Sequence, residues 1–236
     1  MARLAVVTGA SSGIGLAVAR TFAAAGHPLL LLARHMEAVP DLAGKPVLYA
    51  SVDVADFDAF RHAVRDAEQR HGGTDCLVNA AGFADARPFE EVPPADYERE
   101  IRTNLLGVLN GIKAVLAGMT ERKGGTIINI SSVSDRKTSP VALAYTASKY
   151  GVRALSESLR EAEGRHGVRV MNVAPGYVKT NIHQGMGITF EEYCRRLGNP
   201  DFMTADELAA IILYCYQLPA HLCVRDLVVA PTRTTF

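Results

Sequence analysis

The sequence lacks the patterns that mark several common classes of protein. Basic and acidic residues balance at 25 each and form no long run of one sign, so nothing indicates a nucleic-acid partner or an anionic membrane surface. No apolar run approaches the ~18 residues that a transmembrane helix needs. The chain begins almost directly on an apolar strand pattern, so we expect no signal peptide. These absences favour a cytoplasmic protein.

Metal and disulfide patterns are also missing. The four cysteines, Cys76, Cys194, Cys215 and Cys223, form no Cys-x-x-Cys pair. Cys76 and Cys215 lie in apolar runs, which is typical of buried thiols in a reducing compartment. The seven histidines form no His-x-x-x-His pair and no cluster with carboxylates. We therefore predict no metal site.

What the sequence does contain is an alternation of strand and helix patterns from end to end. Short apolar runs predict strands at residues 4–8, 28–33, 47–52, 76–79, 125–131, 168–174 and 226–230. Helical patterns cover residues 16–25, 56–71, 96–120, 145–164 and 204–218, and the segment 35–44 has room for only one or two helical turns. The alternation predicts an α/β fold, a Rossmann-type doubly wound parallel sheet of about seven strands with helices on both faces.

One segment falls outside this alternation. Residues 179–203 combine glycines around Met186 with Phe190 and Tyr193 and show weak periodicity. We expect a mobile excursion that could close over a bound molecule. No linker, repeat or low-complexity segment interrupts the chain, so residues 1–236 are predicted to form one domain.

The turn after the first strand has the spacing Gly9-x-x-x-Gly13-x-Gly15. Glycines permit a tight turn and let backbone N–H groups approach an anion, which the start of the following helix also favours. The turn lacks the Gly-Lys-Ser/Thr of a P-loop, so a nucleoside triphosphatase is not expected. A pyrophosphate site is the favoured interpretation, and a merely structural glycine turn is the alternative.

The end of the second strand bears on the choice of cofactor. An Asp or Glu there would accept hydrogen bonds from ribose hydroxyls, but the sequence reads Ala33-Arg34-His35. The Arg34 guanidinium suits a 2′-phosphate, and Ser11 and Ser12 could add hydroxyl contacts. NADP is therefore favoured over NAD, with a solvated Arg34 as the alternative.

Tyr145 and Lys149 stand four residues apart in a helical pattern, so they share one face of the helix. A phenol ionises near pH ~10, and a nearby ammonium lowers its pKa. The pair is therefore predicted to give a tyrosine able to exchange a proton near neutral pH. Taken alone, a surface pair of neighbours is the alternative.

Together these motifs resemble those of the short-chain dehydrogenase/reductase family, in the same order and over nearly the whole chain. The likeness rests on the turn Thr8–Gly15, the pair Asp53-Val54, Asn79-Ala80-Ala81-Gly82 (with Ala80 where the family has a second Asn), Asn104, Ser132 thirteen residues before Tyr145, the pair Tyr145 and Lys149, and Pro175–Thr180.

The resemblance implies an active site. Tyr145 would be the acid/base, Ser132 would hold the substrate oxygen, Lys149 would lower the Tyr145 pKa and bind the nicotinamide ribose, and Asn104 would hold a water that links Lys149 to solvent. Predicted cofactor-binding residues are Gly9, Ser11, Ser12, Gly13, Ile14, Gly15, Arg34, Asp53, Val54, Asn79, Ala80, Ala81, Gly82, Tyr145, Lys149, Pro175, Gly176, Val178 and Thr180.

The function implied is an NADP(H)-dependent oxidoreductase that interconverts a small carbonyl compound and an alcohol, in a homodimer or homotetramer. A non-catalytic NADP-binding sensor or scaffold, an NAD-preferring dehydrogenase, and an epimerase or dehydratase are the alternatives. The substrate walls are expected at residues 81–89, 133–143 and 180–202. The charged run Asp135-Arg136-Lys137 either selects a polar substrate or, as we favour, is solvated at the rim of the pocket.

Overall fold

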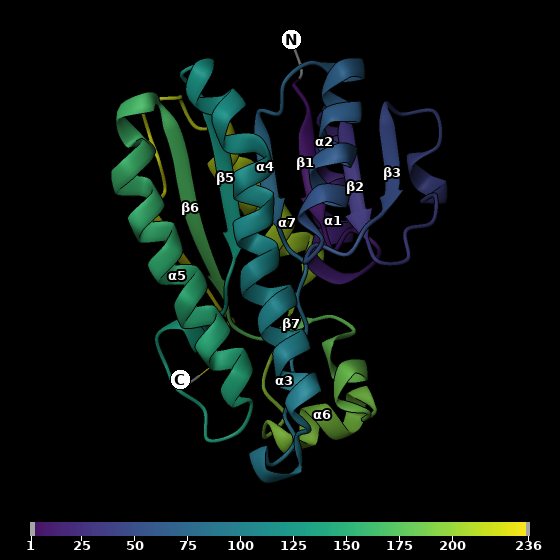
Figure 1. The fold of residues 1–236 in the computed structure, drawn as a ribbon. Helices are drawn as coiled ribbons and strands as arrows, with labels where there is room; N and C mark the ends of the chain where they lie inside the picture. Colours follow the sequence, from purple (N-terminus) through teal and green to yellow (C-terminus); the bar gives the residue numbers. More distant parts are fainter. Residues whose placement is uncertain (1–2, 235–236) are drawn as a thin grey trace.

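A seven-stranded parallel sheet forms the centre of the protein, in a computed structural model that describes residues 3–234 (Figure 1). The strand order is β3-β2-β1-β4-β5-β6-β9. The strands are β1 (Ala5–Thr8), β2 (Leu29–Ala33), β3 (Val47–Ser51), β4 (Cys76–Asn79), β5 (Gly125–Ile130), β6 (Val168–Pro175) and β9 (Asp226–Val229). Each matches a predicted apolar run, with β6 extending one residue beyond it, and this confirms the doubly wound α/β fold.

Helices cover both faces of this sheet (Figure 1). The helices α1 (Gly13–Ala24) and α7 (Ala205–Gln217) pack on one face, and α2 (Phe57–His71), α4 (Gly107–Glu121) and α5 (Leu143–Glu163) pack on the other. Alternate strand residues serve the two sides: Val7 belongs to the α1 and α7 cluster, and Val6 to the α2, α4 and α5 cluster. The strands are apolar on both faces for this reason.

The loops after β1 and β4 are held together at the point where the strand order reverses. The Thr8 hydroxyl accepts hydrogen bonds from the backbone N–H of Ala80 (3.0 Å) and Ala81 (3.1 Å). Gly9 has a φ of +65°, and a Cβ there would lie 2.8 Å from the Ala81 Cα. Only glycine fits this approach. Open α/β sheets bind ligands at such a switch point.

The helix predicted over residues 96–120 contains an irregularity. It begins as α3 (Pro94–Ile101), passes through a π-helical turn (Arg102–Leu106) and continues as α4. Within this turn the Asn104 amide donates to the Phe83 carbonyl oxygen (2.8 Å) and accepts from the Phe83 N–H (3.1 Å). The turn thus ties the helix to the loop after β4, and π-helical turns are frequent at functional sites.

The excursion, residues 179–203, has more secondary structure than its weak periodicity predicted. The short strand β7 (Val178–Lys179) pairs with β8 (Met203–Thr204), and between them lie a 3₁₀ turn (Ile182–Met186) and α6 (Phe190–Arg196). The aromatic rings of Phe190 and Phe202 pack with centroids 5.3 Å apart. In Figure 1, α6 lies beyond the carboxyl ends of the strands, so the excursion stands over this edge.

Shorter elements complete the chain. Further 3₁₀ turns are Pro40–Leu42, Phe89–Glu91, Val133–Asp135 and Gly164–His166, the first of which confirms the abbreviated connection predicted at 35–44. Cys76 and Cys215 are buried, as predicted. Within residues 3–234 no helix has the length and apolar character to cross a membrane, and no three metal-binding side chains gather.

Candidate active site

A cleft of about 940 Å³ runs along the carboxyl edge of the sheet, under the excursion. Loops after six of the strands line it, from β1 to β6. The predicted site residues that line it are Gly9, Ser11, Ser12, Gly13, Ile14, Gly15, Arg34, Asp53, Val54, Ala80, Ala81, Gly82, Ser132, Tyr145, Lys149, Pro175, Gly176, Val178 and Thr180. Asn79 and Asn104 do not line it, and the three predicted substrate walls all contribute.

The glycine turn is folded back on itself at one end of this cleft. A Cβ at Gly15 would lie 2.4 Å from the Gly9 carbonyl oxygen, so glycine is required there. Ser12 precedes α1 without a side-chain capping bond, which leaves the first N–H groups of α1 open toward the cleft. This cradle fits the pyrophosphate of a dinucleotide.

Arg34 lies beside the cradle, at the end of β2. Its side chain is exposed, lines the cleft and forms no ion pair or hydrogen bond with another part of residues 3–234. The guanidinium is therefore available to a ligand. Asp53 lines the cleft from the loop after β3, and its carboxylate accepts a hydrogen bond from the Ala55 N–H (2.9 Å).

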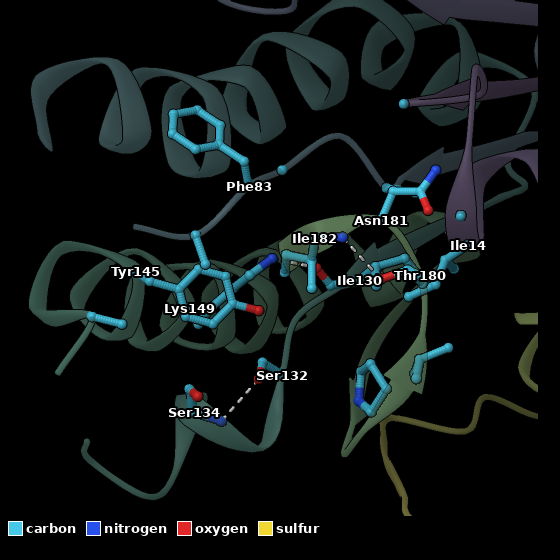
Figure 2. A pocket seen from close by; sticks show the side chains of 18 of the residues that line it. Ile14, Phe83, Ile130, Ser132, Ser134, Tyr145, Lys149, Thr180, Asn181 and Ile182 are labelled. Carbon is cyan, nitrogen blue, oxygen red and sulfur yellow. Dashed lines mark hydrogen bonds between the residues drawn. The ribbon is translucent and has the colours of Figure 1, made fainter. Parts of the chain in front are cut away.

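Tyr145 and Lys149 face the same side of the cleft from α5, opposite the end of β5 (Figure 2). The Lys149 Nζ lies 5.4 Å from the centroid of the Tyr145 ring and donates to the Ile130 carbonyl oxygen at 2.9 Å. Ser132 follows β5, and its hydroxyl accepts a hydrogen bond from the Ser134 N–H (3.1 Å). The structure thus brings the three predicted reactive side chains together.

The pKa of the Tyr145 phenol corrects one prediction. Burial raises this pKa to about 12; contact with the Ser132 hydroxyl acts to lower it, and the Glu100 and Asp135 carboxylates act to raise it. Burial likewise lowers the pKa of Lys149 to about 8, against the pull of the same two carboxylates. The Tyr145 pKa therefore lies above its ordinary value in this structure, in the direction opposite to the predicted lowering, and burial is the largest cause.

Asn104 lies behind the cleft, in the π-turn. Besides its bonds to Phe83, its amide donates to the Ser148 hydroxyl (3.3 Å). A Cβ at Gly82 would lie 3.1 Å from the Asn104 Oδ1 and 3.7 Å from the Lys149 Nζ, so both side chains border one small space. The position suits the predicted link between Asn104 and Lys149, which stays a prediction.

The Asn79 side chain points into the sheet interior. Its amide donates to the Asn129 Oδ1 (2.8 Å), and the Asn129 amide donates to the Ser156 hydroxyl (2.9 Å) on α5. Asn79 therefore helps to connect β4 to β5 and, through Asn129, to α5 beneath the site. Its side chain does not line the cleft where the cofactor contact was predicted. Asn129 was not singled out from the sequence, although an Asn inside an otherwise apolar strand was a visible signal.

Glu100 is a buried acid near the site that the sequence did not reveal. It is 1% exposed, lies one turn before Asn104, and accepts a hydrogen bond from the Asp85 N–H (3.2 Å). Burial raises its pKa to about 7, with the nearby Lys149 charge acting to lower it. A glutamate on a polar helix gives no sign in sequence that it will be buried.

Replacing this acid should stabilise the protein at high pH. Glu100 binds its proton more tightly in the folded state, so its ionisation destabilises the fold between the unfolded pKa of ~4.5 and the folded value of about 7. Glu100→Gln removes that ionisation and should raise the free energy of unfolding by about 3 kcal/mol at pH 8, and by much less at pH 5. Urea unfolding at both pH values measures this difference.

Glu98→Gln is the matched control, because Glu98 is exposed on the same helix. It should show no comparable gain at pH 8. An equal effect of Glu100→Gln at pH 5 and pH 8 would mean that ionisation of Glu100 does not limit stability.

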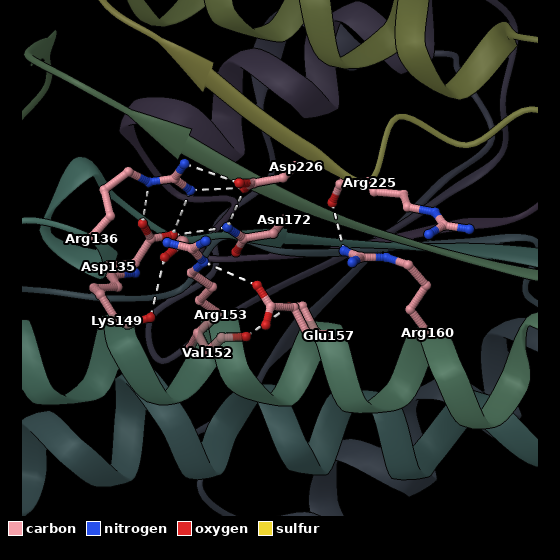
Figure 3. A network of polar contacts seen from close by, with 12 residues as sticks. Asp135, Arg136, Lys149, Val152, Arg153, Glu157, Arg160, Asn172, Arg225 and Asp226 are labelled. Carbon is pink, nitrogen blue, oxygen red and sulfur yellow. Dashed lines mark hydrogen bonds and ion pairs between the residues drawn. The ribbon is translucent and has the colours of Figure 1, made fainter.

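The charged run after Ser132 corrects a second prediction (Figure 3). Asp135 is fully buried and accepts hydrogen bonds from the Arg136 Nε (2.7 Å) and the Asn172 amide (2.8 Å). Arg136 also donates two hydrogen bonds to the Asp226 carboxylate, at 3.0 and 2.8 Å. The prediction of a solvated run is therefore wrong for Asp135 and Arg136, since the two pair with each other and Arg136 also pairs with the distant Asp226. Lys137 remains exposed and lines the cleft.

The sheet is doubly wound and has a glycine cradle at its switch point, and a Tyr–Lys pair lines the same cleft. Together these features define a dinucleotide-binding protein of the dehydrogenase kind. The family model described as short chain dehydrogenase matches residues 3–188. The chain belongs to the short-chain dehydrogenase family and is an oxidoreductase of that family.

Similar proteins agree with this assignment. Sulfoacetaldehyde reductase 2 of Chromohalobacter salexigens is 35% identical over 99% of this chain and 96% of its own. Glycine betaine reductase ATRR of Emericella nidulans is 32% identical over 97% of this chain, which spans only 19% of that larger protein. Among solved structures, a serine dehydrogenase complexed with NADP+, in its closed form, superposes with a TM-score of 0.92 at 28% identity, covering 99% of this chain and 96% of the other.

Proposed function

We propose that the protein is an NADP(H)-dependent oxidoreductase that interconverts a carbonyl compound and an alcohol, with Tyr145 as acid/base. The observation that carries the proposal is the meeting of Ser132, Tyr145 and Lys149 in the cleft that also holds the glycine cradle. A relative named as an aldehyde reductase and a structural neighbour complexed with NADP+ support it.

The side chains suit this chemistry. A bound nicotinamide dinucleotide would supply or accept the hydride. With a pKa of about 12, the Tyr145 phenol carries its proton at neutral pH and can donate it to the oxygen of a carbonyl substrate. The Ser132 hydroxyl would orient that oxygen, and the Lys149 ammonium would stabilise the phenolate left behind. In the reverse direction the same phenolate takes the proton of an alcohol.

A turnover screen tests the proposal. Aldehydes, ketones and alcohols are offered with NADPH or NADP+, and with the NAD pair, while the nicotinamide absorbance is followed. Turnover of a carbonyl compound with NADPH is the expected result. Tight NADPH binding without turnover of any compound would favour the sensor or scaffold instead.

The role of Arg34 in cofactor choice has its own test. Arg34→Ala should weaken NADPH binding by about 10- to 100-fold, because a charge-assisted hydrogen bond is worth about 1.5–3 kcal/mol. NADH lacks the 2′-phosphate, so its binding should change far less. Calorimetric titration of both cofactors measures the two dissociation constants.

Arg65→Ala is the control for this comparison, since Arg65 is exposed on α2 and does not line the cleft. It should leave both dissociation constants unchanged. Equal losses of NADPH and NADH affinity in Arg34→Ala would remove the 2′-phosphate role and favour the NAD-preferring alternative.

We also propose that the protein is a cytoplasmic homodimer or homotetramer. Exposed apolar side chains on the long helices, Leu109 on α4 and Tyr150 on α5, support an oligomer through that face. Light scattering coupled to size-exclusion chromatography tests the assembly, and a monomer at micromolar concentration would contradict it.

A further inference from the structure

The cleft has an uneven distribution of charge. Among its lining residues within 3–234, one carboxylate is present, that of Asp53, and it lies at the end of β3 beside the proposed adenosine site. The half that holds Ser132 and Tyr145 contains no lining carboxylate but has the cations Lys137, Lys149 and Arg196. A substrate in that half therefore meets a positive surface.

Lys137 is the cation in this half that is left for a ligand. Its two charged neighbours are neutralised, since Asp135 pairs with Arg136 and Arg136 with Asp226. Lys137 itself is exposed and has no carboxylate within ion-pair distance in residues 3–234. By contrast, Lys149 is buried and donates to the Ile130 carbonyl oxygen.

The backbone fixes Lys137 on the loop that carries Ser132. The Lys137 N–H donates to the Val133 carbonyl oxygen (3.1 Å), which closes the turn immediately after Ser132. The flexible stem of a lysine can then reach a substrate whose carbonyl lies at Ser132. The neighbouring lining residues Ser134 and Thr138 add hydroxyl groups, which also suit an anion.

Arg196 approaches the same half from α6, but its charge is shared. Its Nε and Nη2 both bond to the Glu192 carboxylate, at 3.1 and 2.6 Å. Arg196 is therefore a weaker attraction for an anion than Lys137, although the excursion brings it to the cleft.

We propose that the substrate is a small aldehyde or ketone that carries an anionic group, a carboxylate or a sulfonate, and that Lys137 binds that group. The inference rests on the proposed carbonyl chemistry and names the class of substrate on which it acts.

The test compares 4-oxobutanoate with its methyl ester, which carries the same aldehyde but no charge. The native protein should prefer the anion by about 10- to 100-fold in kcat/KM, since a hydrogen bond to a charged group is worth about 1.5–3 kcal/mol. Lys137→Met should remove most of that preference, and Lys137→Glu should reverse it. Because the side chain is exposed, neither change should unfold the protein.

Two further measurements sharpen the test. Lys113→Met is the matched control, because Lys113 is exposed on α4 and lies outside the cleft lining, and it should keep the native preference. Calorimetric titration with unreactive butanoate and butanamide should show tighter binding of the anion, which Lys137→Met abolishes.

The outcomes separate the two proposals. Turnover of the ester with no preference for the anion would overturn the anionic substrate while leaving the carbonyl chemistry intact. An anion preference that survives in Lys137→Glu would overturn the role of Lys137. No turnover of either aldehyde, or of any compound in the wider screen, would overturn the carbonyl chemistry and the substrate class with it.

Discussion

Tyr145→Phe should lower kcat by about 10³-fold, change NADPH affinity far less, and leave thermal stability almost unchanged. The substitution deletes only the phenolic oxygen, so the ring keeps its packing against Lys149. What disappears is the proton donor, and general acid catalysis contributes about 10²- to 10⁴-fold. Steady-state rates with the best substrate of the screen, together with cofactor titration and a melting curve, measure the three quantities.

Tyr214→Phe is the natural control, because Tyr214 is 67% exposed on α7 and lies outside the cleft lining. It should turn over substrate at the native rate. If Tyr145→Phe also kept the native rate, another group would be the acid, and our assignment would be wrong.

The second large effect concerns stability. Asp135→Ala should lower the free energy of unfolding by about 3 kcal/mol, because it removes a fully buried carboxylate that accepts hydrogen bonds from both Arg136 and the Asn172 amide. The Arg136 guanidinium keeps Asp226 as a partner, but the Asn172 amide loses one of its two acceptors. Guanidinium unfolding with an unchanged m-value measures the loss.

Glu157→Ala provides the comparison, since it breaks the Arg153–Glu157 pair, which is far more exposed. That pair should contribute less than about 1 kcal/mol. Asp135→Asn should fall between the two, because the amide keeps one oxygen as an acceptor. Equal losses for Asp135→Ala and Glu157→Ala would show that the buried network contributes no more than a surface pair.

The sequence predicted the sheet well because strand burial is a local property of composition. Runs such as Leu29–Ala33 are apolar at every position, which is typical of a strand that is buried on both faces of a parallel sheet. The glycine turn was predictable for a similar reason, since Gly9 and Gly15 occupy positions where no side chain fits.

The predictions that were wrong concerned residues whose environment depends on contacts with distant parts of the chain. Asn79 and Asn129 are register partners on β4 and β5, and no local pattern reveals a pairing across fifty residues. Asp135 and Arg136 looked solvated because their partners, Asn172 and Asp226, come from β6 and β9. The helix α6 has only seven residues, too few to show a helical period.

The predicted direction of the Tyr145 pKa shift was wrong for another reason. The sequence shows the charge of Lys149 but gives no measure of how much water either side chain loses, and desolvation decides the net shift.

The packing of α7 on α1 has a consequence for biosynthesis. Leu208 and Ile212 of α7 are fully buried in the same cluster as Phe22 of α1, whose ring lies 5.2 Å from that of Tyr216. The helix that follows the glycine turn leaves the ribosome well before α7 does, and its apolar face is covered only after α7 emerges. The nascent chain must therefore carry this uncovered face while all the elements between α1 and α7 are made, and the face is a natural target for chaperones.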